Sequence, residues 1–336
     1  LLALTSTVGE LSSAFAADDP IPGYIDQIDS NNLVNVATEL VTQYGPRRED
    51  VYSPYIDANC TIGSTVYPKS TIDMSADYIK GLFETMGYSP DEITMEELPG
   101  GAGHNVYVTK VGSSYPNVFI EYSGHYDTVL GTPGGNDNAS GSTAVIELAR
   151  VLKDYPNRHS MRFILWAAEE YSNERGVAYF GSAYHVQQSL ARGEEIKAGL
   201  VMDHIGWPDP ADPTGLMNEV HYTDVESDRI ADLANQVRVD YGIVIGFRKM
   251  YNLANSDNQA YWDLDQAAVG SGGGHSVYHP EYHDCGDTVA NIDFTNVLRV
   301  TQQNLAVGLK LDAETYPPPG PTATPTAGPP IAFPST

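Results

Sequence analysis

The fold is decided by NVFIEYSGHYDT, residues 117–128, in which an apolar run leads directly into a polar motif. The same arrangement recurs in MRFILWAAEE at 161–170 and in AGLVMDH at 198–204. Nearly continuous apolar runs are typical of strands whose two faces are both buried in a parallel sheet. Amphipathic segments lie between these runs and predict helices. The sequence therefore predicts an α/β fold, a single globular domain with a mostly parallel central sheet and helices on both faces.

The predicted elements alternate between residues 30 and 313. Strands are expected at 91–98, 105–111, 117–123, 161–167, 198–203 and 266–271. Helices are expected at 31–44, 75–87, 140–153, 178–190, 227–240, 257–263 and 293–312. Ser30 is suited to cap the first helix, in which Leu33, Val36 and Leu40 fall on one face. The sequence contains no internal repeat and no dinucleotide-binding or P-loop motif.

The two ends of the chain depart from this pattern. Residues 1–29 are predicted to be the remnant of an export signal, because small residues (SSAFA) precede Ala17, or else an N-terminal arm. Residues 316–336 carry no charge, and eight prolines fall in the last twenty residues. This composition predicts an extended Pro/Thr-rich linker or tail. The folded domain is therefore expected to span residues 30–315.

The chain is strongly acidic. It has 336 residues, with 18 Lys and Arg against 44 Asp and Glu, which gives a net charge of −26. Such a charge disfavours binding to nucleic acid and to anionic membranes. No apolar run is long enough to predict a transmembrane helix.

Cys60 and Cys285 are the two cysteines of the sequence. In an exported protein such a pair is usually oxidised, so we expect a disulfide between them. Two free thiols, or Cys285 as an additional metal ligand, are the alternatives.

Polar residues follow three of the predicted strands. His125 follows the first, Glu169 and Glu170 follow the second, and Asp203 follows the third. In open α/β sheets, ligands bind beyond the carboxyl ends of the strands. Asp137 lies in a glycine-rich loop just before a predicted helix. We therefore expect these side chains to converge on one edge of the sheet.

A fifth motif, YHDCGDT at 282–288, adds His283 to the set. Imidazole and carboxylate groups are ligands that zinc accepts. Two zinc ions can share a hydroxide and lower its pKa, and an adjacent carboxylate can take a proton from the attacking water. The pair Glu169 and Glu170 suits this division, because one carboxylate can bind metal while the other faces the water.

Each motif has a less specific interpretation when it is considered alone. GHYDT can be a strand end with an ordinary histidine, and AAEE can begin a solvated loop. We interpret His204, His275 and His279, which lie near the motifs, as ordinary polar residues. All five motifs occurring in order indicate a metal site, which no single motif does.

That order, GHYDT, GGNDNASG, AAEE, GSAY, MDHIG, SDN and YHDCGDT, resembles the co-catalytic di-zinc exopeptidases. The family includes bacterial leucyl-type secreted aminopeptidases, with glutamate carboxypeptidase and glutaminyl cyclase as relatives. The resemblance covers about residues 30–313 and implies the phosphorylase/hydrolase-like fold of the zinc exopeptidases. It also implies two zinc ions per chain.

The resemblance assigns a role to each of five metal ligands. Asp137 would bridge the two ions. His125 and Asp203 would complete one coordination shell, and Glu170 and His283 would complete the other.

Four further residues take roles from the resemblance. Glu169 would be the general base, and Tyr282 would steady the oxyanion of the tetrahedral intermediate. Asp127 and Asp287 would support the ligands from behind, Asp127 by fixing the imidazole of His125.

The chain departs from the family pattern at two positions. Ser256 and Asp257 match a family SDH motif, but Asn258 replaces its histidine. His204 stands where the family commonly has methionine. Both departures bear on the shape of the substrate pocket.

The sequence thus predicts a secreted or cell-surface metallo-aminopeptidase, which hydrolyses the N-terminal peptide bond of peptides with a hydroxide bound to two zinc ions. One alternative is a structural or self-assembling surface protein that retains a peptidase fold. Another is a relative of the carboxypeptidases or glutaminyl cyclases. Self-association or attachment would involve the N-terminal arm and the Pro-rich tail.

Overall fold

The computed structural model describes residues 19–57, 59–170, 178–207, 215–253, 256–272 and 279–316. In these ranges the chain forms one eight-stranded sheet with the order β1-β2-β4-β3-β5-β8-β6-β7. The strands are β1 Ile93–Glu97, β2 His104–Lys110, β3 Tyr115–His125, β4 His159–Trp166, β5 Glu195–Met202, β6 Met217–Tyr222, β7 Gly246–Tyr251 and β8 Ala268–Gly272. Strands β4, β3, β5 and β8 are parallel neighbours, as are β6 and β7.

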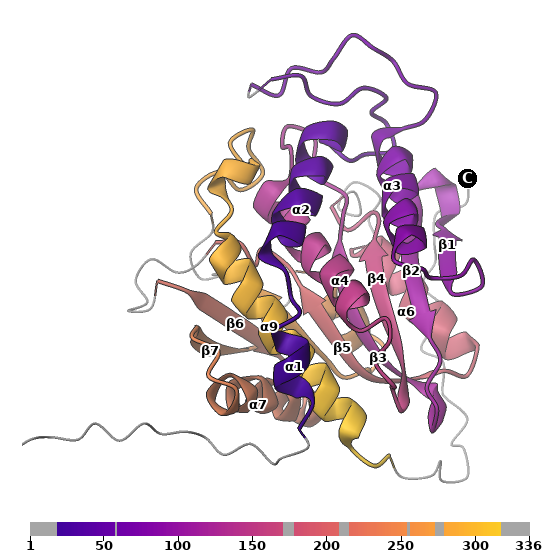
Figure 1. Cartoon of the computed structure of the whole chain (residues 1–336). Helices are drawn as coiled ribbons and strands as arrows, with labels where there is room; N and C mark the ends of the chain where they lie inside the picture. The colour runs from indigo at the N-terminus through magenta and orange to yellow at the C-terminus, as the bar shows by residue number, and fades with distance from the viewer. Residues whose placement is uncertain are drawn as a thin grey trace, which may run out of the picture.

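Helices cover both faces of the sheet (Figure 1). The first face is packed against α3 Thr71–Thr85, α4 Ser140–Val151, α7 Val225–Asp240 and α9 Phe294–Ala313. Helices α1 Ile21–Ile25 and α2 Ser30–Tyr44 lie on the same side and pack on these helices. The other face is packed against α6 Phe180–Ala191 and α8 Asn258–Trp262. Short turns occur at η1 Pro99–Gly101, η2 Gly135–Ala139 and η3 Val289–Asn291. The predicted α/β architecture with a mostly parallel sheet is confirmed.

Two hydrophobic clusters correspond to the two faces. The larger joins the first group of helices to the sheet, and α4 is buried along nearly its whole length within it. The smaller contains Trp166, Val201 and Tyr261 beneath α6 and α8. Burying one large apolar side chain contributes about 1.5–3 kcal/mol, so the two clusters together hold the central strands rigidly in register.

Strands β6 and β7 and the short helix α1 were not predicted from the sequence. Strand β6 has buried polar side chains at Asn218, Glu219 and His221, which break the apolar pattern expected of a buried strand. Strand β7 lies at the edge of the sheet and is largely polar, with Arg248 and Lys249. The predicted cap of α2 was also wrong by one residue. Ser30 is the first helical residue, and the Asp29 side chain accepts the hydrogen bond from the backbone N–H of Asn31.

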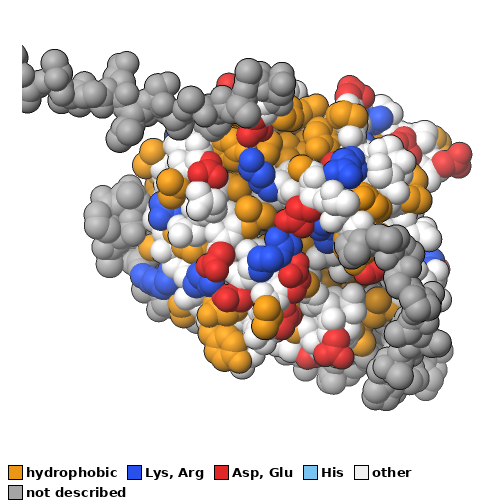
Figure 2. Space-filling model, turned by 90° about the horizontal axis from the view of Figure 1, so that it is seen from below, with side chains coloured by type: hydrophobic (Ala, Val, Ile, Leu, Met, Phe, Trp, Pro, Cys, Tyr) orange, Lys and Arg blue, Asp and Glu red, His pale blue; other side chains and the backbone are white. Residues whose placement is uncertain are grey.

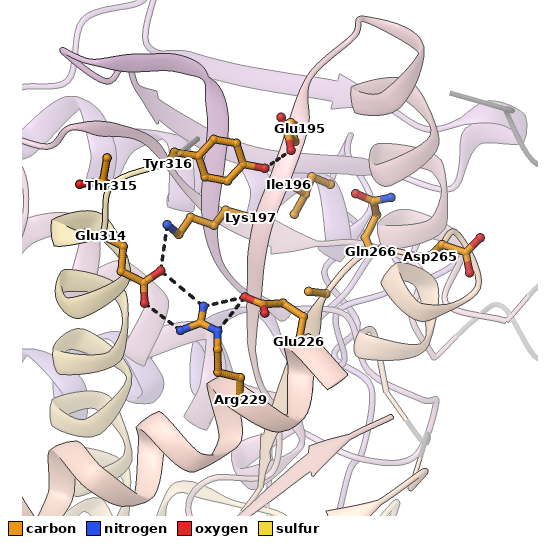
Figure 3. A pocket seen from close by; sticks show the side chains of 11 residues that line it. Glu195, Ile196, Lys197, Glu226, Arg229, Asp265, Gln266, Glu314, Thr315 and Tyr316 are labelled. Carbon is orange, nitrogen blue, oxygen red and sulfur yellow. Dashed lines mark hydrogen bonds and ion pairs between the residues drawn. The ribbon is translucent and has the colours of Figure 1, made fainter. Parts of the chain in front are cut away.

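The far end of the sheet, opposite the carboxyl ends of the central strands, holds a polar pocket of about 540 Å³ (Figure 3). A chain of ion pairs crosses it. Glu314 contacts Lys197 at 3.0 Å and Arg229 at 2.8 Å, and Arg229 contacts Glu226 at 2.6 Å. Seen from below the view of Figure 1, the molecule shows acidic and basic side chains interspersed rather than segregated (Figure 2).

Tyr316 packs against the body of the protein beside this pocket. Its hydroxyl donates to Glu195, and its ring lies 6.1 Å from that of Tyr115 and 5.3 Å from the Lys197 ammonium. We therefore place the proposed start of the tail after Tyr316 rather than before it. The predicted signal remnant, as far as residue 18, and the tail from residue 317 lie outside the described residues.

The segment 46–70 arches over the carboxyl edge of the sheet at the top of Figure 1 and is anchored at several points. Cys60 forms the predicted disulfide with Cys285, with a Cα–Cα distance of 5.6 Å. The Tyr55 hydroxyl accepts a hydrogen bond from the backbone N–H of Gly131 at 2.8 Å. The segment therefore connects the loop after β3 to the loop that carries His283. Among the described helices, none is both long and apolar enough to cross a membrane.

Removing the disulfide should destabilise the fold. The bonded cysteines are 225 residues apart, and closing so long a loop contributes up to about 5 kcal/mol on the chain-entropy model. We expect the double variant Cys60→Ser, Cys285→Ser to unfold at a lower urea concentration than the parent protein. Its metal content should also fall, because Cys285 lies two residues from His283. Alkylation of two thiols in the folded, non-reduced protein would contradict the bond itself.

Candidate metal centre

The central strands place three acidic or imidazole motifs at one edge of the sheet. His125 ends β3, Glu169 and Glu170 follow β4, and Asp203 follows β5. The register pairs His125 with Trp166 and Ser123 with Val201, so the three strand ends lie level. All four polar side chains are buried. Parallel strands thus bring together residues that are nearly 80 positions apart.

Asp137 reaches the same place from a tight loop. Gly134, with φ of 72°, starts this loop in the left-handed region, where a Cβ would lie 2.2 Å from a methyl carbon of Thr128. The carboxylate of Asp287 accepts the backbone N–H groups of Asn136 at 2.6 Å and Asp137 at 3.1 Å. Glycine and Asp287 together fix the direction of the Asp137 side chain.

The Asp137 carboxylate lies between two histidines. Its Oδ1 is 3.2 Å from Nε2 of His125, which is 3.3 Å from Oδ1 of Asp203. Its Oδ2 is 3.1 Å from Nε2 of His283, which is 3.1 Å from Oε1 of Glu170. Two groups of three potential metal ligands result, with Asp137 in both.

These distances match the requirements of a metal ion. Two ligands about 2.1 Å from a tetrahedral ion lie roughly 3.4 Å apart. The four contacts above, 3.1 to 3.3 Å, are close to that value. Both carboxylate oxygens of Asp137 and Oδ1 of Asp203 are buried and accept no hydrogen bond from the described part of the chain. The residues present therefore fit the two cations that the sequence predicts.

The local electrostatics show an excess of buried negative charge. Burial, together with the charge of Asp137, raises the pKa of Glu170 to about 8. Burial also raises the pKa of Glu169, and neighbouring carboxylates add to the shift. For Asp137, burial would raise the pKa, but the charge of His204 and the contacts with His125 and His283 lower it. A cation bound here would relieve the repulsion that protonation relieves in its absence.

Asp127 lies behind the proposed ligands and contacts both the acidic loop and His125. Its two carboxylate oxygens accept the backbone N–H groups of Glu169 at 3.1 Å and Glu170 at 3.0 Å. Its Oδ1 also lies 3.5 Å from Nδ1 of His125. One carboxylate thus fixes the start of the acidic loop and faces the histidine nitrogen that points away from Asp137.

Glu169 and Tyr282 complete the predicted set. Among the described residues, Glu169 belongs to neither group of three, although it interacts electrostatically with His125, Asp203 and Glu170. The Tyr282 ring stacks on that of His283 with centroids 3.7 Å apart. Burial and the nearby carboxylates raise the pKa of Tyr282, which keeps its hydroxyl protonated. Both side chains therefore adjoin the ligand groups without being part of them.

The other histidines near the motifs fall into three cases. His204 contacts the first ligand group, since its Nε2 is 3.5 Å from Oδ1 of Asp137 and 3.5 Å from Oδ1 of Asp203. From the sequence, His204 was interpreted as an ordinary polar residue, and these contacts place it beside the two carboxylates. His279 instead packs edge-on against Trp207 and accepts the backbone N–H of Glu281. His275 lies outside the described residues.

Asp257 belongs to the SDN segment, which departs from the family's SDH motif, and it is also buried near the centre. Its side chain is fully enclosed, and burial raises its pKa to about 7, with the charge of Asp203 contributing. Asn258 stands where the family has histidine, and its side chain packs against Gly270 on β8. A Cβ added at Gly270 would lie 2.9 Å from the side-chain oxygen of Asn258. The departure therefore leaves both ligand groups intact.

Arg47 is a residue of this region that the sequence reasoning missed. Its guanidinium is fully buried and donates to the backbone carbonyls of Tyr126, Leu40, Pro133 and Gly134. Three of these carbonyls belong to the loop between His125 and Asp137. Burial lowers the pKa of Arg47 to about 10, while Asp287, Asp127, Asp137 and Glu170 oppose the shift. The signal available in the sequence was an arginine beside proline in Gly45-Pro46-Arg47, which polarity alone assigns to the surface.

A model of peptidase family M28 matches residues 105–308 of the chain, which include all five proposed ligands. The chain belongs to peptidase family M28. Leupeptin-inactivating enzyme 1 of Streptomyces exfoliatus is 27% identical over 275 residues, and the match covers 77% of this chain and 59% of that protein. This chain therefore spans less than two thirds of the length of that relative.

Solved structures show that the fold is shared with other proteins. The LapA aminopeptidase of Legionella pneumophila has a TM-score of 0.69 at 20% identity, covering 94% of this chain and 80% of that one. A glutaminyl cyclase of Bacteroides thetaiotaomicron has a TM-score of 0.62 at 17% identity, covering 84% and 97%. At these identities the likeness establishes the fold and leaves the reaction to be argued from the site.

Replacing Arg47 should loosen the centre as well as the fold. Arg47→Met leaves buried carbonyls unpaired, at about 1–3 kcal/mol each, and frees the loop that positions Asp137. We expect a lower melting temperature and faster loss of metal to a chelator, measured well below that temperature. Arg47→Lys should have a melting temperature and a rate of metal loss between those of Arg47→Met and the parent protein.

Arg162 offers a matched control. It is also buried, but it pairs with Glu121 and Glu194 on the opposite face of the sheet. Arg162→Met should lower the melting temperature without changing the rate of metal loss. Equal rates of metal loss in the two methionine variants would contradict a specific role for Arg47.

Proposed function

We propose that the protein is a zinc-dependent aminopeptidase that hydrolyses the N-terminal peptide bond of peptides. The observation that carries the proposal is the Asp137 carboxylate, which presents one oxygen to each of two histidine-carboxylate groups. A bridging carboxylate of this kind suits two ions a few ångströms apart. Membership of peptidase family M28 supports peptide hydrolysis as the reaction.

Zinc is the metal that the ligand set favours. His125, Asp137 and Asp203 would hold one ion, and Asp137, Glu170 and His283 the other. Imidazole with carboxylate suits zinc, whereas sites made of oxygen alone suit magnesium or calcium. When bound, two zinc ions would lower the pKa of an attacking water and polarise the carbonyl of the scissile bond.

Glu169 is proposed as the general base. Its carboxylate adjoins the ligand groups without joining them, and Asp127 fixes its backbone. In this role it takes the proton of the attacking water and then delivers it to the leaving amine. Tyr282 is proposed to donate its hydroxyl hydrogen to the oxyanion that forms on the scissile carbonyl. Its raised pKa keeps that hydrogen in place.

The charges around the centre favour a substrate that binds through its N-terminal ammonium group over one that binds through its C-terminal carboxylate. Buried carboxylates attract a substrate ammonium group. A C-terminal carboxylate needs a basic partner, yet Arg47 is enclosed and bonded to carbonyls, and Arg48 pairs with Asp50 at 2.8 Å. A location outside the cell or on its surface agrees with the Cys60–Cys285 bond, because disulfides persist in oxidising compartments.

The proposal is tested by turnover and metal content together. The purified protein is assayed against a panel of aminoacyl anilides, with and without a chelator, and its metal is determined by elemental analysis. We expect chelator-sensitive release of the anilide and close to two zinc equivalents per chain. Metal near one equivalent after zinc supplementation, with cyclisation of N-terminal glutamine instead of hydrolysis, would indicate a glutaminyl cyclase. An absence of metal and turnover would favour a non-enzymatic surface protein.

The adjacent glutamates should separate rate from metal binding. Glu169→Gln removes the general base, and we expect kcat to fall by about 10²–10⁴-fold with metal content retained. Glu170→Gln removes a ligand, and we expect it to lose metal as well as activity. The two variants are isosteric with the parent side chains and serve as controls for each other. Full activity in Glu169→Gln would show that the roles within the pair are wrongly assigned.

A further inference from the structure

Asn105 is a fully buried polar residue that belongs to neither ligand group. It lies on β2, directly across the sheet from Glu96 of β1. Its side-chain oxygen accepts the backbone N–H of Ala167 at 3.1 Å. Its side-chain nitrogen donates to the Glu96 carboxylate at 2.8 Å and to the backbone carbonyl of Gly181 at 2.9 Å. The partners fix the orientation of the amide, because one is a donor and the other two are acceptors.

The bond to Ala167 is made where β4 ends and the acidic loop begins. The next residue, Ala168, has a φ of 57°, in the left-handed region that is uncommon for residues other than glycine. Glu169 follows, and its backbone N–H is bound by the Asp127 carboxylate at 3.1 Å. One strained residue therefore lies between two backbone N–H groups that are each held by a buried side chain, Asn105 before it and Asp127 after it.

The Asn105 amide is itself held by rigid elements. The Glu96 carboxylate lies 3.3 Å from Nδ1 of His185 on α6. Nε2 of that histidine lies 3.4 Å from the buried carboxylate of Glu121 on β3. The third partner, Gly181, belongs to the first turn of α6. The amide is therefore anchored to two strands and a helix, whereas the backbone that it holds opens a loop.

We propose that Asn105 is a positioning residue that sets the direction of the Glu169 carboxylate by fixing the backbone at Ala167. The inference rests on the role of general base proposed for Glu169. If the Ala167 N–H were released, the strained residue after it could relax, and the carboxylate would turn with the loop. A displacement of about 1 Å in a reacting group can lower the rate by about 100-fold.

The first test compares the steady-state kinetics of the zinc-loaded parent protein and Asn105→Ala on an aminoacyl anilide. We expect kcat to fall by about 10–100-fold. KM and the zinc content should be unchanged, because Asn105 contacts neither the proposed ligands nor the space for substrate beside them. An unchanged kcat in folded Asn105→Ala would overturn the inference.

Asn157 provides the matched control. It is also a buried asparagine between β2 and β4, but at the opposite end of these strands, where its side chain donates to the carbonyls of Lys110 at 3.2 Å and His159 at 2.7 Å. Asn157→Ala should lower the melting temperature and leave kcat unchanged. An equal fall in kcat in both variants would show a general loss of stability and would overturn the specific role of Asn105.

A double variant tests whether Asn105 acts through Glu169. In the Glu169→Gln background the base is already absent, so Asn105→Ala should cause little further fall in kcat. The same fold-loss in both backgrounds would overturn the inference while leaving the proposed function intact. A parent protein that binds zinc but releases no anilide would instead overturn the proposed function.

Hydrogen exchange in the unaltered protein covers the case in which Asn105→Ala does not fold. The amide of Ala167 lies beyond the end of β4, and we expect it to exchange as slowly as amides within that strand because Asn105 holds it. Exchange of the Ala167 amide at the rate of an exposed loop amide would overturn the inference, since the bond that carries it would be absent in solution.

Discussion

The burial of seven carboxylates at one edge of a sheet is the constraint on which this structure depends. Each is at most 8% exposed: Asp127, Asp137, Glu169, Glu170, Asp203, Asp257 and Asp287. Buried charges of one sign are costly unless opposite charges or hydrogen-bond donors compensate them. Three histidines and Arg47 supply part of that compensation, and backbone N–H groups satisfy Asp127 and Asp287. The raised pKa of Glu170 and of Asp257 shows that the remainder is missing. Divalent cations bound here would supply it without protonation of the carboxylates.

Backbone conformation places these groups where side-chain rotation alone could not. Ala168, His204 and His283 have φ of 57°, 53° and 58°, and each lies in a loop at this edge. Non-glycine residues adopt such values at a cost, and strained residues of this kind often gather at functional sites. Arg47 stabilises the same region by binding carbonyls of the loop between His125 and Asp137. The buried Arg47 guanidinium therefore anchors the loop that leads to Asp137.

The sequence could predict those residues of the centre that local patterns place, but not those that only tertiary contacts place. His125, Glu170 and Asp203 were predictable because continuous apolar strands precede them, and parallel strands end at a common edge. Strand β6 was not predictable, because Glu219 and His221 are buried through tertiary contacts that a local sequence pattern does not show. Arg47 and His204 share that difficulty. An arginine beside proline is usually exposed, and only the folded chain shows that four carbonyls surround it. Likewise, the approach of His204 to Asp137 depends on one left-handed residue, which neither composition nor periodicity indicates.

The two ligand groups also differ in their exposure to solvent. The segment 46–70 restrains the more exposed group through its disulfide to Cys285. The side chains of His125 and Asp203 are 1% and 5% exposed, whereas that of His283 is 34% exposed. The first group is built on strand ends within the rigid core, while His283 comes from a loop outside the sheet. The disulfide from Cys285 to Cys60 restrains this loop close to its ligand residue. A metal held by His283 would leave more easily if the loop could open, so the covalent bond is placed at the weaker half of the centre. The stability of the chain and the retention of a metal held by His283 would therefore be coupled through this disulfide.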